Sequence, residues 1–201
     1  KHMLLRLFII VLLALAPRPS PLAPVTAEAA HVEQLEGVTV VYLEGSPYEV
    51  GRQHGELLKD RVRASVGHLL GYFRHYLKIP FLGAWLVNWW LDHPWKQARP
   101  FIPPDYLDEL QGLSDGSGVP MKELARLHAI PDRTYACSGL AVWGQATSDG
   151  RLIHTRNLDW NIHAGIQDYA TVFVVQPKGK RAFVNVGWAG FIGVLTGINE
   201  E

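Results

Sequence analysis

The sequence predicts an α+β fold in which a helical first half is followed by a second half built of β-hairpins. Apolar residues recur at helical spacing after residue 47, whereas short β-branched runs separated by turn residues follow residue 137. The chain has 201 residues, of which 48% are hydrophobic. This length and composition are sufficient for one domain with a buried core.

Residues 1–29 are expected to form a signal peptide. Positive charges at Lys1 and Arg6 precede the apolar run 7–16, which is too short to cross a bilayer comfortably as a helix. An Ala-Glu-Ala cleavage pattern then ends at Ala29. The sequence therefore indicates export to a periplasmic, secreted or lysosome-like location, with an uncleaved anchor as the alternative.

Residues 30–136 are expected to form the helical N-terminal part. The β-branched and aromatic run 38–43 predicts a strand. Ser46 can cap a helix and Pro47 suits its first turn, so we expect one long helix from Pro47 into the region 72–77.

Further features of this half are two glycines, two helices and a loop. Gly51 and Gly55 lie four residues apart on the long helix, where they are expected to allow close packing of helix on sheet. Helices are expected over 103–113 and 121–128, with a loop over 114–119.

The segment 81–95 carries four of the seven tryptophans. Such a segment is expected to be part of the core, or else the wall of a pocket for an apolar acyl group or a lipid-contacting surface.

Residues 137–201 are expected to be rich in strands. The runs 140–146 and 152–157 predict a hairpin around the turn Asp149-Gly150. Three more strands are expected over 169–176, 181–186 and 193–198. The last of these would present an unpaired edge, which favours self-association.

Charge and histidine content narrow the class of partner. The 19 Lys+Arg balance the 19 Asp+Glu, and no basic run is present, so a nucleic-acid partner is not expected. Nine histidines raise the question of a metal site, but His154 and His163 lack the spacing of a zinc motif. We expect neither a metal nor a cofactor.

The single cysteine, Cys137, cannot form a disulfide within the chain. It is either a buried small hydrophobe or a reactive nucleophile. Arg156 and Asp159 lie at the far end of the strand that returns from the predicted turn. Since the start of one hairpin strand lies beside the end of the other, both residues are expected next to the thiol.

Each of these groups has a chemical use. The permanently charged guanidinium of Arg156 favours the nucleophilic thiolate, and the Asp159 carboxylate can hold a protonated amine. If the chain is cut before Cys137, that residue gains an α-amine whose ordinary pKa of about 7.7–8.0 suits a general base. Nucleophile and base then belong to one residue.

This pattern resembles the cysteine N-terminal-nucleophile (Ntn) hydrolases, most of all the isopenicillin N acyltransferase family and more distantly acid ceramidase and the choloylglycine hydrolases. The matching stretches are GSPYEVGRQHG (45–55), IPPDYLDELQGLSDGSGVP (102–120), the start at Cys137, DGRLIHTRNLDW (149–160) and GVLTGINEE (193–201).

The resemblance implies an αββα sandwich of antiparallel sheets flanked by helices and autocatalytic cleavage between Ala136 and Cys137. Residues 137–201 would then begin the β segment of the Ntn domain. Members of the family continue beyond the segment that ends here at Glu201, so the sandwich is expected to be incomplete at its C-terminal end.

By the same resemblance, Arg156 lies beside the nucleophile and Asp159 holds the new amine. The mature enzyme attacks a linear amide, forms a thioester on Cys137 and passes the acyl group to water or to an amine. Asn157, Trp160 and Trp143 are expected to shape the substrate site. The apolar segment 81–95 favours a small-molecule amide with an apolar acyl group.

Other classes of function fit the sequence less well. A serine hydrolase based on Ser138 lacks the G-x-S-x-G elbow, and a papain-like protease needs more chain after the cysteine than is present. A truncated, inactive family member that binds a ligand or a lipid surface is the remaining alternative.

Overall fold

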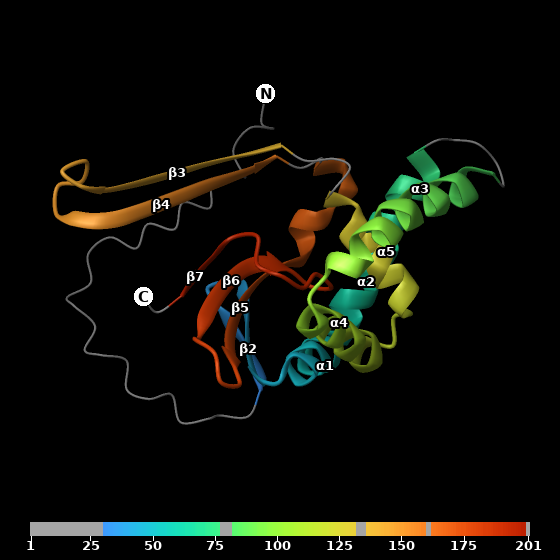
Figure 1. Cartoon of the computed structure of the whole chain (residues 1–201), viewed down its shortest axis with the longest axis horizontal. Helices are drawn as coiled ribbons and strands as arrows, with labels where there is room; N and C mark the ends of the chain where they lie inside the picture. Colours follow the sequence, from blue (N-terminus) through green and yellow to red (C-terminus); the bar gives the residue numbers. More distant parts are fainter. Residues whose placement is uncertain (1–29, 77–81, 132–135, 160–161, 200–201) are drawn as a thin grey trace.

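The computed structural model describes residues 30–76, 82–131, 136–159 and 162–199 (Figure 1). The expected signal peptide lies outside the described residues. The strands are β1 (His31–Leu35), β2 (Val38–Gly45), β3 (Ala136–Gly144), β4 (Gly150–Asp159), β5 (Ala170–Pro177), β6 (Phe183–Trp188) and β7 (Gly197–Asn199). The helices are α1 (Pro47–Leu57), α2 (Lys59–Tyr76), α3 (Leu82–Ala98), α4 (Pro104–Ser117) and α5 (Met121–Ala129), with 3-10 turns η1 (Arg99–Phe101), η2 (Ile162–Ala164) and η3 (Ile166–Tyr169).

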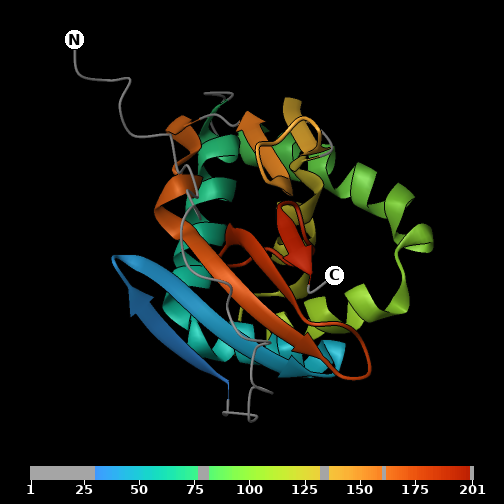
Figure 2. The same cartoon turned by 90° about the vertical axis from the view of Figure 1, so that its left-hand side faces the viewer.

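The structure confirms the α+β class. Five strands form one sheet in the order β1-β2-β5-β6-β7, and the helices lie on one face of it, with α3 farthest from the sheet and packed on α2 and α5 (Figures 1 and 2). Strands β2 and β5 pair in parallel, so this sheet is mixed rather than wholly antiparallel. The hairpin β3–β4 forms a second, two-stranded sheet that projects away from the rest of the molecule (Figure 1).

The expectation of one long helix after residue 46 is wrong. Ser46 caps α1 as predicted, with the Glu49 side chain completing a capping box. The helix then breaks at Leu58, whose φ and ψ are −113° and 26°. The break lets α1 lie along α4 while α2 turns its apolar side, including Val62 and Leu69, into the core.

Glycines bring α1 and α4 into backbone contact. The expected packing of Gly51 and Gly55 against a sheet is wrong, because both face α4. A Cβ atom on Gly51 would lie 1.9 Å from the Glu109 carbonyl oxygen, and one on Gly55 would lie 2.5 Å from the Ser117 nitrogen. Gly112, on α4, approaches the backbone of α1 just as closely. No side chain fits between the two helices.

The loop expected over 114–119 is also wrong for most of its length. Helix α4 continues to Ser117, whose hydroxyl donates to the Leu113 carbonyl oxygen at 2.6 Å. The helix ends only where Gly118 adopts a left-handed conformation with φ 72°.

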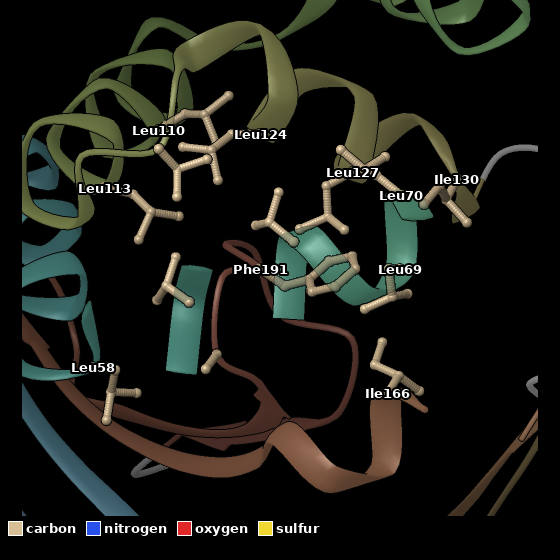
Figure 3. Close-up of a cluster of buried hydrophobic side chains, with 14 of the residues drawn as sticks. Leu58, Leu69, Leu70, Leu110, Leu113, Leu124, Leu127, Ile130, Ile166 and Phe191 are labelled. Carbon is tan, nitrogen blue, oxygen red and sulfur yellow. The ribbon is translucent and has the colours of Figure 1, made fainter. Parts of the chain in front are cut away.

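The core lies between the helices and the sheet. Leucines from α2, α4 and α5 meet there, and Phe191 enters among them from the turn after β6 (Figure 3). This turn, residues 189–193, is therefore anchored in the core although it belongs to no helix or strand. The labelled members of the cluster are Leu58, Leu69, Leu70, Leu110, Leu113, Leu124, Leu127, Ile130, Ile166 and Phe191.

The tryptophan-rich segment forms α3. Its Val87 and Leu91 are buried, whereas Trp85 and Trp89 are 61% and 60% exposed, so the core reading holds for only one side of the helix. Trp95 lines a cavity of about 280 Å³ beside α4. None of the described helices is both long enough and apolar enough to span a membrane.

Candidate active site

The hairpin β3–β4 places the residues singled out by the sequence. Cα partners across the two strands are Ala136 with Asp159, Cys137 with Leu158 and Gly139 with Arg156. Side chains alternate between the two faces of a strand, and cross-strand partners share a face. Cys137 and Arg156 therefore lie on one face, and Asp159 lies on the other.

The thiol of Cys137 contacts a guanidinium. Cys137 is exposed, so the reading of this cysteine as a buried hydrophobe is wrong. Arg156 Nη2 donates a hydrogen bond to Cys137 Sγ at 3.2 Å. A donor that carries a full charge at this distance favours the negatively charged form of sulfur, which is the nucleophilic one.

The guanidinium of Arg156 is held from its other side by the segment that leads into β7. Its Nη1 donates to the carbonyl oxygen of Leu195 and, at 2.9 Å, to the hydroxyl of Thr196. The Arg156 side chain thus has partners at both terminal nitrogens, Nη1 and Nη2, and these partners orient it toward the thiol. Leu195 and Thr196 were not singled out from the sequence.

Three side chains fix the 189–193 turn ahead of this segment. The Gly190 N–H donates to His54 Nε2 at 3.1 Å, and the Ile192 N–H donates to His128 Nε2 at 2.9 Å. Asn185 Nδ2 donates to the Gly193 carbonyl oxygen at 3.2 Å.

Both imidazoles are neutral near pH 7. Burial lowers the pKa of His54 to about 3, and burial lowers the pKa of His128 to about 4. Each ring nitrogen can therefore accept a backbone N–H. The contact gives His54 a structural role. His128, on the apolar side of α5, is a residue that sequence reasoning missed; a histidine at a core position was the available signal.

Asp159 and Asn157 lie on the face opposite Cys137. The Asp159 carboxylate accepts a hydrogen bond from Asn157 Nδ2 at 2.8 Å. Because Asp159 is the cross-strand partner of Ala136, its backbone lies beside the bond expected to be cut. Thiol and carboxylate thus sit on either side of the strand start, with the Cys137 main chain between them.

The structure does not bring Trp143 to this end of the hairpin. Trp143 is 65% exposed and lies six residues further along β3, which is about 20 Å in an extended strand. Trp160 lies outside the described residues. Within the parts of the chain that the structure describes, no group of three or more His, Cys, Asp or Glu side chains is arranged to hold a metal ion.

Comparison with known proteins gives distant relatives. No family model matches the chain. The chain is 32% identical over 182 residues to protein dcd1B of Dictyostelium discoideum, covering 82% of this chain and 36% of that protein. It is 27% identical over 111 residues to acid ceramidase of Rattus norvegicus, covering 48% of this chain and 27% of that protein. It is 21% identical over 138 residues to the N-acylethanolamine-hydrolyzing acid amidase of the same organism, covering 69% of this chain and 35% of that protein.

The chain thus spans about a third of the length of the curated relatives it matches. The similarities to acid ceramidase and to the acid amidase support the Ntn hydrolase superfamily that the motifs predict. A closer kinship with the isopenicillin N acyltransferase family stays a prediction.

Proposed function

We propose that this chain carries the nucleophile of an exported cysteine amidohydrolase or N-acyltransferase that matures by cutting itself before Cys137. The observation that carries the proposal is the contact between the exposed Cys137 thiol and the fixed guanidinium of Arg156 at 3.2 Å. Similarity to an acid ceramidase and to an N-acylethanolamine-hydrolyzing acid amidase supports the reaction class.

The maturation step begins at Cys137. Its Sγ attacks the carbonyl carbon of Ala136, and the bond from that carbon to the Cys137 nitrogen breaks. The nitrogen takes up the proton that the thiol gives away. Water then splits the Ala136 thioester, which releases a carboxylate at Ala136 and leaves Cys137 with a free thiol and α-amine.

In the mature protein the α-amine acts as the base. It takes the thiol proton as Sγ attacks the substrate carbonyl, then gives that proton to the departing amine. Arg156 stabilises the thiolate through its hydrogen bond to Sγ. Asp159, whose backbone lies beside Ala136 at the start of β3, holds the α-amine when that amine is protonated. The acyl group then leaves Cys137 for water or for an acceptor amine.

Capture of the acyl intermediate tests this function. We expect incubation with an N-octanoyl amide to release the amine and, after rapid acid quenching, to leave octanoyl on the fragment that begins at Cys137. Cys137→Ala should abolish both signals. Ser138→Ala alters the exposed neighbouring residue on the other face and should leave both intact. Amine release that persists in Cys137→Ala would contradict the proposal.

The same assay addresses substrate and acceptor. An N-acetyl amide of the same amine should react more slowly, because the apolar acyl group is expected to supply binding energy. Equal rates would remove the preference for apolar acyl groups. Formation of a new amide when glycinamide is added would identify transfer rather than hydrolysis.

A non-catalytic lipid-contacting function is favoured by one observation, the exposure of Trp85 and Trp89 on α3. Sedimentation with vesicles of neutral phospholipid tests it. Binding by Cys137→Ala that is lost in a Trp85→Ser, Trp89→Ser double variant would support this second function, and unchanged binding in that variant would exclude it.

A further inference from the structure

A cavity of about 320 Å³ lies between the helices and the sheet, away from β3. Its volume is at the lower end of the range for small-molecule sites, about 300–1,000 Å³. The wall is mostly apolar and is built from β2, β5, β6, α1, α4 and the turn after β6. Apolar members of this wall include Leu43, Val50, Phe173, Val175, Phe183 and Phe191.

The inner wall of this sheet–helix cavity holds one hydrogen-bond acceptor without a partner. Asn185 is 7% exposed, and its Nδ2 is already used on the Gly193 carbonyl oxygen. Because the Gly193 carbonyl can only accept, this bond assigns the nitrogen and the oxygen of the Asn185 side-chain amide. Oδ1 is buried and, within the residues that the structure describes, has no hydrogen-bond partner. Because a buried acceptor left unpaired costs free energy, the site calls for a ligand with a donor.

The wall also holds a donor at Glu109, in addition to the phenol of Tyr106, a residue that is 47% exposed. Burial raises the pKa of Glu109 to about 7. In its protonated form the Glu109 carboxyl donates a hydrogen bond, so it is suited to a carbonyl oxygen.

The other titratable groups of the wall leave the interior uncharged. His54 is neutral, because burial lowers its pKa to about 3, and its Nε2 accepts from the Gly190 N–H. Lys180 and Asp105 form an ion pair at 2.5 Å and are both more than half exposed. A charged group inside this cavity would lose its hydration without a counter-ion.

We propose that this cavity is a binding site, separate from Cys137, for a small uncharged molecule that carries a secondary amide between apolar groups. The ligand N–H donates to Asn185 Oδ1 and the ligand carbonyl accepts from Glu109, while its apolar groups lie against Phe173 and Phe191. The inference stands on the cavity and does not rest on the proposed catalytic function.

Isothermal titration calorimetry tests the proposal. The amide is titrated into the Cys137→Ala chain, because this variant cannot consume an amide through the thiol. The probe is N-butylhexanamide, and N-butyl-N-methylhexanamide is the matched compound without an N–H. We expect the secondary amide to bind about fivefold more tightly, the worth of one hydrogen bond. Asn185→Leu should remove this difference.

The pH dependence tests the role of Glu109. Binding of N-butylhexanamide should weaken about thirtyfold from pH 5.5 to pH 8.5, because the fraction of protonated Glu109 falls about thirtyfold around a pKa of about 7. Glu109→Gln keeps a donor and should bind equally at both pH values. The exposed Glu56 on α1 gives the control Glu56→Gln, which should behave like the parent.

Three results would overturn the proposal. They are no binding of either amide, equal binding of both amides to the Cys137→Ala chain, and tighter binding of hexylammonium than of N-butylhexanamide at pH 5.5, where Glu109 is neutral.

Discussion

At the scale of single residues, the account depends on how Arg156 is oriented. One guanidinium nitrogen contacts Cys137 Sγ, and another bonds to Leu195 and Thr196. Since arginine presents several donors in a rigid plane, it can serve both partners at once. A lysine has a single ammonium and cannot reproduce this fork.

Replacing Arg156 is therefore expected to slow reactions of the thiol. We expect Arg156→Ala to reduce the rate of Cys137 alkylation by iodoacetamide at pH 7 about tenfold, the worth of one hydrogen bond to a charged group. Arg156→Lys should fall between Arg156→Ala and the parent. Arg151→Ala, an exposed arginine of the same strand, should have no effect, and an unchanged rate in Arg156→Ala would contradict the role of the guanidinium.

Glu109 is expected to destabilise the fold at alkaline pH. Burial raises its pKa in the folded chain to about 7, above the ordinary value of 4.5, so the folded state binds more protons between these values. The folded state loses stability as pH rises through this window. Glu109→Gln should therefore raise the Tm at pH 8.5 more than at pH 4.5, as measured by circular dichroism. An equal change at both pH values would show that the carboxyl is not desolvated.

At the scale of elements, the close approach of α1 and α4 is the contact most sensitive to substitution. Gly51→Ala would place a methyl group against the backbone of Glu109, and this backbone cannot move without separating the helices. We expect a loss of about 3 kcal/mol in the free energy of unfolding, measured with urea.

Gly71 on α2 is the matched control. A Cβ atom there meets nothing within 4 Å, so Gly71→Ala should stabilise the chain by about 0.5–1 kcal/mol through helix propensity. If the two substitutions had equal effects, α1 and α4 would not be in backbone contact.

The turn after β6 should be sensitive to acid, because two neutral histidines hold it. The pKa of His128 is lowered to about 4 and that of His54 to about 3, both below the ordinary 6.5. Below about pH 6.5 the unfolded chain binds more protons than the folded one, so stability falls with pH until the folded values are reached.

We expect His128→Gln, which keeps an acceptor but does not titrate, to reduce this loss. Between pH 7.5 and pH 4.5, the free energy of unfolding should fall more in the parent than in His128→Gln, by on the order of 2 kcal/mol. The exposed His75 gives the control His75→Gln. Urea unfolding at the two pH values makes the measurement, and identical losses in His128→Gln and the parent would refute the neutral state of His128.

At the scale of the whole molecule, local patterns predicted most strands and the hairpin that carries the thiol. The Asp149-Gly150 turn predicts that β3 pairs with β4. The approach of Arg156 to Cys137 could be predicted as well, because it depends only on this turn. The break at Leu58 was not predictable in this way. It depends on α4, which meets α1 through Gly112, more than fifty residues further along the chain.

The same limit applies to the site. Leu195 and Thr196 lie in an irregular segment, and no periodicity marks them as partners of Arg156. Likewise, the apolar run 81–95 is compatible with core, pocket wall or lipid-contacting surface, because such a run cannot show which of its residues face solvent.

The intact mass of the incubated chain tests the central claim most directly. The account predicts two fragments that meet between Ala136 and Cys137, the second starting with Cys137 by N-terminal sequencing, and a single uncut chain for Cys137→Ala. A parent chain that stays whole, or a Cys137→Ala chain cut at the same bond, would contradict it.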